Sequence, residues 1–161
     1  MKRFITLFTL LSLLCTLTAC QNTKTFSAEE MTITLTNEFV EVPSTRKGGA
    51  FESPDMFIRV VRESRSVVED VAGHSDVALE TYTDLVLAAN KLSLPVTREK
   101  NCLTYEYTAL DEEVGRYYTY YVTVHKSRDA FWLIQFIVDE TDYADKQAEI
   151  ATYLESIEFD R

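Results

Sequence analysis

The chain of 161 residues is 46% hydrophobic and 12% aromatic, a content typical of a folded domain rather than a disordered tail. Its formal net charge of −10 at pH 7 argues against nucleic acid as a partner and against binding to anionic lipid headgroups through a basic patch. At this length we expect one domain with a sizeable core.

The first residues have the pattern of a bacterial secretory signal. Lys2 and Arg3 precede an uncharged, mainly apolar stretch over 4–14. This stretch is shorter than the roughly 20 residues that span a bilayer. Leu17-Thr18-Ala19-Cys20 then resembles a lipobox, the processing site of bacterial lipoproteins. The resemblance implies cleavage before Cys20, lipid on its sulfur, and attachment to the outer face of the cytoplasmic membrane.

These features predict a signal peptide over 1–19, a lipidated N-terminus and linker over 20–24, and a domain over 25–161. Loss of Lys2 and Arg3 with the signal brings the formal charge to −12. Of the three cysteines, one lies in the signal and one carries lipid, which leaves Cys102. We expect Cys102 to be a small buried side chain rather than a reactive thiol, and no disulfide within the domain.

The predicted elements follow from hydrophobic periodicity and from turn residues. In chain order they are a strand over 32–35, its continuation over 39–42, an exposed loop over 44–50, a strand over 56–61, irregular chain over 63–73, a helix from Ser75 to Asn90, a short strand over 96–99, three strands over 103–110, 116–126 and 130–138, a helix over about 142–156 capped by Thr141 or Asp142, and a brief strand over 157–159.

The strand over 130–138 carries large apolar side chains on both of its faces. Trp132, Ile134 and Phe136 alternate with Phe131, Leu133 and Ile137. A sheet that is apolar on both faces must be covered on both sides, and two amphipathic helices are available to cover it. We therefore predict an α+β domain that is a three-layer α/β/α sandwich with a mainly antiparallel central sheet.

The whole predicted domain resembles the PsbP-like fold. The residues that carry the resemblance are Thr25-Phe26-Ser27, Ile33-Thr34-Leu35, the helix before Asn90, the tyrosine-rich hairpin, the run from Ala130 to Phe136, and Tyr153-Leu154-Glu155-Ser156-Ile157. This fold is shared by the extrinsic P protein of photosystem II, a Ran-binding nuclear import factor and small bacterial lipoproteins. The resemblance implies a fold, and no residue with a chemical role carries over to this chain.

Two groups of polar residues are candidates for a catalytic or metal site. The histidines, His74 and His125, lack ligand spacing, and we expect His125 to be an exposed residue near the end of a strand. Four acids invite a calcium interpretation, but acids in the first turn of a helix also complement its dipole, which we favour. These acids are Asp139, Glu140, Asp142 and Asp145. No metal or cofactor is expected.

Tyrosines offer the one aromatic area large enough for a ligand. Tyr105, Tyr107, Tyr117 and Tyr121 form a possible stacking surface for a sugar or peptide, although a place in the core under a helix is favoured. Glycines beside positive charge in the predicted loop, Arg46-Lys47-Gly48-Gly49, lack the spacing of a phosphate loop.

The sequence therefore predicts a membrane-anchored, extracytoplasmic lipoprotein that binds rather than catalyses. Its expected partner is an envelope protein or a small ligand. The alternative from another class is a hydrolase of envelope material, for which the available carboxylates are Glu106, Asp111 and Glu113. A purely structural surface lipoprotein is the third possibility, distinguished by the lack of any pocket or apolar patch.

Overall fold

The computed structural model describes residues 22–160. The predicted signal peptide and the predicted lipidation site, Cys20, lie outside the described residues. Within the described range, no helix has both the length and the apolar character needed to cross a membrane.

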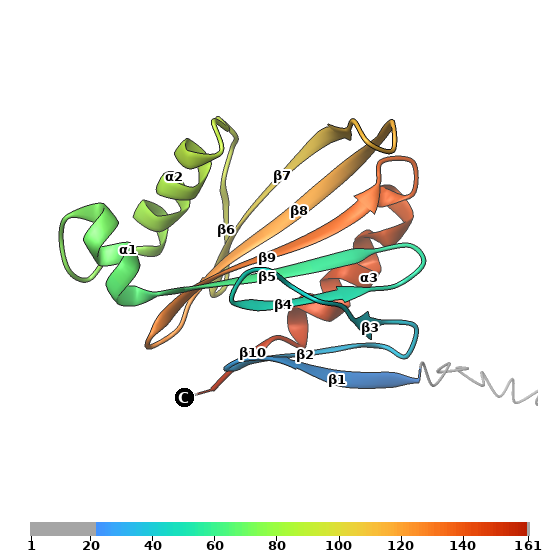
Figure 1. Cartoon of the computed structure of the whole chain (residues 1–161), viewed down its shortest axis with the longest axis horizontal. Coiled ribbons are helices and arrows are strands. Elements are labelled where there is room, and N and C mark those ends of the chain that lie inside the picture. The colour runs from blue at the N-terminus through green and yellow to red at the C-terminus, as the bar shows by residue number, and fades with distance from the viewer. Residues whose placement is uncertain (1–21, 161) are drawn as a thin grey trace, which may run out of the picture.

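Over residues 22–160 the chain forms two β-sheets and three helices (Figure 1). The strands are β1 (Thr23–Ala28), β2 (Met31–Thr36), β3 (Val40–Glu41), β4 (Gly48–Glu52), β5 (Phe57–Ser64), β6 (Thr97–Glu99), β7 (Cys102–Asp111), β8 (Arg116–Lys126), β9 (Ala130–Asp139) and β10 (Glu158–Phe159), and the helices are α1 (Arg65–Ala72), α2 (Leu79–Ala89) and α3 (Tyr143–Glu155). The larger sheet has the order β3-β4-β5-β9-β8-β7-β6 and the smaller the order β1-β2-β10.

The predicted meander is confirmed as β7, β8 and β9. All strand pairs in the described range are antiparallel, and β9 lies between β5 and β8 near the middle of the larger sheet. The structure is thus α+β with mainly antiparallel sheets, as the sequence predicted.

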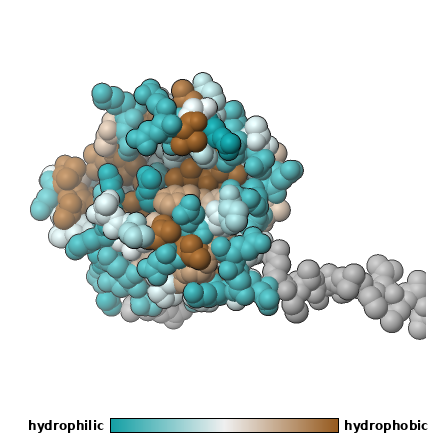
Figure 2. All heavy atoms as spheres, turned by 45° about the vertical axis from the view of Figure 1, so that its right-hand side comes forward, coloured by the Kyte–Doolittle hydropathy of each residue, from teal (hydrophilic) through white to brown (hydrophobic). Residues whose placement is uncertain are grey.

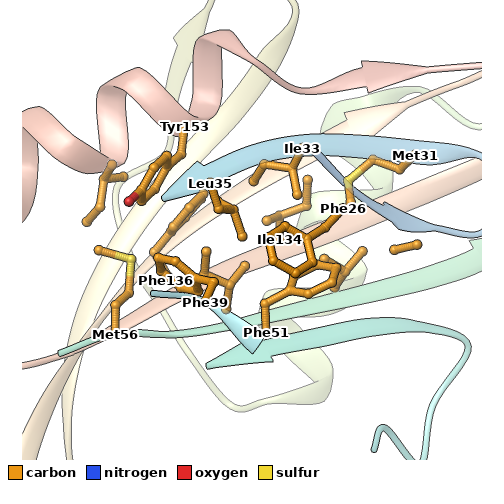
Figure 3. Close-up of a cluster of buried hydrophobic side chains, with 14 of the residues drawn as sticks. Phe26, Met31, Ile33, Leu35, Phe39, Phe51, Met56, Ile134, Phe136 and Tyr153 are labelled. Carbon is orange, nitrogen blue, oxygen red and sulfur yellow. The ribbon is translucent and has the colours of Figure 1, made fainter. Parts of the chain in front are cut away.

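Both faces of β9 are buried. Trp132, Ile134 and Phe136 belong to one apolar cluster, into which β1 and β2 also send side chains (Figure 3). Phe131 and Leu133 belong to a second cluster on the other face. Helix α3 contacts β2 and β9 on the first side, whereas α1 contacts β5 and β9, and α2 contacts β7 and β8. The expectation of an apolar sheet shielded above and below is therefore correct for β9.

The segment predicted to be irregular over 63–73 is instead the end of β5 followed by α1. This prediction was wrong because α1 buries only Val68, while Val67 and Val71 remain 55% and 70% exposed. A helix with one buried residue leaves little of the apolar periodicity by which helices are predicted.

The next helix begins at Leu79 rather than at Ser75, and Ala78 holds the N-cap position. Asp76 prevents an earlier start, because its backbone has a φ of 56°. Its carboxylate lies 2.8 Å from Arg65 Nη2 and 3.3 Å from Lys126 Nζ, and these contacts hold the turn between α1 and α2.

Two predicted connections are shorter than expected. Thr23 and Lys24, placed in the linker by the sequence, pair with β2 as part of β1. The loop predicted over 44–50 ends early because Gly48 starts β4 with a φ of +118°. A Cβ at this position would lie 2.2 Å from the carbonyl oxygen of Val60, so only glycine fits.

Candidate functional site

A groove of about 1150 Å3 lies between α3 and the outer strands of the larger sheet, and we call it the α3 groove. Strands β7 and β8 form its floor, α3 forms one wall, and the turn between β6 and β7 forms the other. Residues from the C-terminal end of the described chain, including Phe159, close one end. The groove exists because α3 packs mainly on β9 and β2, and no other helix of the described residues packs on β7 and β8 on this face.

The register of the hairpin decides which side chains face the groove. Glu106 pairs with Tyr121 and Thr104 with Thr123, so alternate residues of both strands point to the side of α3. The groove-lining residues on these two strands are Cys102, Glu106, Tyr121, His125 and Lys126.

His125 is buried in the floor of the groove, with 9% of its surface exposed. Its Nε2 lies 3.0 Å from Thr123 Oγ1, and its ring lies 5.3 Å from the ring of Phe159. Burial lowers the pKa of His125 to about 4, so the imidazole is neutral at pH 7. The prediction of an exposed residue near a strand end was wrong because Phe159, far away in sequence, covers the ring.

Cys102 is half-buried beside the same groove and makes no disulfide. Burial, with a smaller contribution from the charge of Glu99, raises the pKa of its thiol. The thiol is therefore protonated at neutral pH and is a weak nucleophile. Cys102 was expected to be buried but is only half-buried, and it lines a space that the sequence did not reveal.

Tyr143 joins the wall of the groove to its floor. Its hydroxyl donates a hydrogen bond of 2.7 Å to Glu106 Oε2 on β7. Burial and the nearby carboxylate raise the pKa of Tyr143, and burial raises that of Tyr121. The apolar part of the wall comes from Ile150 and Leu154 of α3.

The four predicted tyrosines do not form one surface. Tyr107 pairs with Tyr120, so Tyr105 and Tyr107 lie on the face opposite to Tyr117 and Tyr121. Tyr105 is in the core with 4% exposure, as favoured, whereas Tyr117 is 54% exposed. Among the four, Tyr121 alone lines the α3 groove. Side chains alternate between the two faces along each strand of the hairpin. This alternation is the sequence signal that separates the four tyrosines.

The three carboxylates considered for hydrolysis are not brought together. Glu106 faces the groove, but Asp111 lies five residues further along β7, roughly 16 Å away at the usual rise per strand residue. Asp111 Oδ1 instead accepts hydrogen bonds from the backbone N–H groups of Glu113 and Val114, at 2.9 and 3.2 Å. These two contacts form the turn between β7 and β8.

The acidic segment before α3 is used for local structure. Asp139 Oδ1 accepts hydrogen bonds from the N–H and the hydroxyl of Thr141, at 3.0 and 2.8 Å, and these bonds lower the pKa of Asp139. Asp142 holds the predicted N-cap position, but its side chain accepts no hydrogen bond from the backbone N–H groups of the helix. Asp145 lies in the first helical turn. Over residues 22–160, no three acidic, histidine or cysteine side chains are arranged to hold a metal ion.

The fold is PsbP-like, as its similarity to one solved structure indicates, and a second solved structure is similar to the same extent. CyanoP, the PsbP of the cyanobacterium Synechocystis sp. PCC 6803, is 12% identical with a TM-score of 0.57, over 90% of this chain and 96% of CyanoP. A protein of Bacteroides thetaiotaomicron VPI-5482 is 17% identical with a TM-score of 0.57, over 87% of this chain. The match covers 49% of the Bacteroides protein, so this chain spans about half its length. At these identities the likeness concerns the fold alone.

No family model matches the sequence. No curated protein matches it either.

Proposed function

We propose that this protein is a lipid-anchored, extracytoplasmic binding module whose ligand or partner occupies the α3 groove. The observation that carries the proposal is the groove itself, in which an apolar helix face meets hydroxyl, imidazole and carboxylate groups. Concave sites that combine apolar walls with a few directed polar groups are the usual binding sites of proteins.

The anchor is the part of the proposal that rests on sequence. Lys2, Arg3 and the apolar stretch over 4–14 precede the lipobox-like residues that end at Cys20. In the described chain, the carbonyl of Asn22 accepts a hydrogen bond of 2.8 Å from the N–H of Asn37. From a lipidated Cys20 to Asn22 the backbone reaches at most ~7 Å, so the domain would lie against the membrane surface.

The finer architecture is also part of the proposal. We describe the domain as a three-layer α/β/α sandwich, in which α1 and α2 form one outer layer. Helix α3 and the sheet β1-β2-β10 form the other. The separate apolar clusters on the two faces of the larger sheet support this description.

Binding is favoured over catalysis by the protonation states in the groove. A neutral Cys102 thiol beside a neutral His125 imidazole is not the ion pair that activates a cysteine nucleophile. Glu106 already accepts a hydrogen bond from Tyr143. These groups are suited to form hydrogen bonds, as donors or acceptors, with a ligand or partner whose surface is uncharged or partly polar and partly apolar.

The proposal predicts that a partner touches Gln147, which is exposed and lines the groove, but not Ala148, which is exposed on the outer side of α3. A photo-crosslinking residue is placed at each position in turn, in cells that make the full chain. A specific adduct from position 147 and none from position 148 is the expected result. Equal adducts, or none from either position, would contradict binding in the groove.

The anchor is tested separately with Cys20→Ala and labelled fatty acid. We expect the unchanged chain to take up label and remain with the membrane, and the variant to take up none and reach the medium. Label on the variant would contradict lipidation of Cys20 without bearing on the groove.

A further inference from the structure

The opposite face of the larger sheet contains a second, smaller pocket of about 370 Å3, at the end that α1 and α2 do not cover. It lies between the β4–β5 loop and the ends of β8 and β9. Figure 2 turns the right-hand side of Figure 1 forward and shows apolar patches among hydrophilic residues on this side of the molecule. We call this space the small pocket.

Aromatic rings form the apolar part of the small pocket. Phe57 pairs with Ile137, which pairs with Tyr120, so these three side chains stand in one row across β5, β9 and β8. Tyr118 follows on the same face of β8, and all four line the pocket. Phe57, Tyr118 and Tyr120 are only partly buried, so part of each ring is accessible. Tyr120 also stacks on Tyr107, with ring centroids 4.7 Å apart.

The faces of such rings attract cations, and the protein already uses one of them in this way. The guanidinium of Arg59 lies over the ring of Phe57, 5.8 Å from its centroid. The attraction comes from the negative charge density on the ring face and grows when water is excluded.

The charged groups of the small pocket are mainly acidic. Five carboxylates line it, on Glu52, Asp55, Asp111, Asp139 and Asp142, against the two guanidiniums of Arg59 and Arg116. Lys146, outside the lining, lies 3.0 Å from Asp55, and Arg116 lies 3.7 Å from Asp139. After these pairs are formed an excess of negative charge remains, which disfavours anions and attracts cations.

We propose that the small pocket binds a small organic cation of the alkylammonium class, held between the aromatic rings and the excess of carboxylates. An alkylammonium group suits both parts, because its alkyl surface packs on rings and its charge faces acids. A metal ion does not suit it, since no three acidic, histidine or cysteine groups in the described chain converge. The site is independent of the α3 groove.

The probe is choline, compared with 3,3-dimethylbutan-1-ol, an uncharged molecule of the same shape. Calorimetry and amide NMR shifts are measured on the purified full chain. We expect choline to shift the amides of Phe57, Tyr118 and Tyr120 and to bind about tenfold more tightly than the uncharged analogue, a ratio typical of a desolvated cation on aromatic rings. Added salt should weaken the binding of choline but not the binding of the uncharged analogue. Equal binding of the two molecules, or no binding of choline, would overturn the proposal.

Two matched pairs of variants locate the site. Tyr118→Leu should reduce choline affinity several-fold and Tyr117→Leu should not, because these neighbours on β8 point to opposite faces of the sheet. Asp142→Asn should also weaken binding, whereas Asp145→Asn, outside the lining, should not. Melting curves show whether each variant is folded. If Tyr118→Leu does not fold, the aspartate pair tests the site instead. If both variants of a pair changed the choline affinity equally, choline would bind elsewhere.

Discussion

Tyr143 on α3 and Glu106 on β7 are joined across the α3 groove by a hydrogen bond of 2.7 Å between the phenol and the carboxylate. The bond connects the helix to a strand that it otherwise leaves uncovered on this face. It also fixes one edge of the floor that a ligand would contact. The contribution of this hydrogen bond to stability is measurable, because removing the phenolic oxygen of Tyr143 abolishes the bond.

We expect Tyr143→Phe to lower the free energy of unfolding by about 1 kcal/mol, the usual net value of one hydrogen bond. Urea denaturation measures the change. Tyr117→Phe is the control, because Tyr117 is 54% exposed and its hydroxyl bonds to no other described residue. Equal stability of the two variants would show that the bond contributes nothing.

Burial of His125 predicts a specific pH dependence. Its folded pKa of about 4 lies below the ordinary value of 6.5, so the unfolded chain binds a proton more readily. The stability that the neutral ring maintains is complete above pH 6.5 and is lost as the pH falls toward 4, by up to about 3 kcal/mol.

The pH effect is measured as the difference between the unchanged protein and His125→Gln, since the many carboxylates titrate equally in both. We expect the difference in unfolding free energy to change between pH 6.5 and 4. A difference independent of pH would mean that the ring is accessible to protons in the folded state.

Gly48 is predicted to be indispensable to the β4–β5 pair. Its φ of +118° and the position of the Val60 carbonyl leave no space for a side chain. Gly48→Ala should cost roughly 3 kcal/mol or more, from backbone strain and the clash together. Gly115→Ala, at a φ of +70° with no atom within 4 Å of the new Cβ, should cost about 1 kcal/mol. Thermal unfolding measures both losses, and a larger loss of stability in Gly115→Ala than in Gly48→Ala would contradict this.

The two-sided core predicts equal sensitivity of the two faces of β9. Phe131 and Phe136 have no exposed surface and belong to different clusters. Each change to alanine should cost about 3–5 kcal/mol. A loss below about 1 kcal/mol at either position would show that one face is poorly packed.

The sequence predicted most reliably where side-chain periodicity was strong. Phe131 to Phe136 alternate so clearly that the strand and both buried faces follow from local pattern. Helix α1 was missed because its exposed Val67 and Val71 obscure the buried side. Glycine and nearby charge favour turns, so the sequence predicts a loop at Gly48. The close approach of Val60 arises only on folding.

The α3 groove could be predicted only in part, since it depends on contacts between distant segments. Glu106 and Tyr121 were considered from sequence, but for different sites. His125 needed Phe159 above it before burial and a lowered pKa could be inferred. Hairpin register is a local property, so the separation of Tyr107 from Tyr117 was within reach of the sequence.

The most direct test of groove occupancy uses Cys102, which lines the α3 groove. Its reaction with a maleimide that does not cross membranes is timed in native membranes and in purified protein. Ser66→Cys in a Cys102→Ser background supplies an exposed thiol position on α1 as the control. The proposal predicts that native membranes slow labelling at position 102 several-fold and leave position 66 unchanged. Equal slowing at both positions, or none at position 102, would contradict an occupied groove.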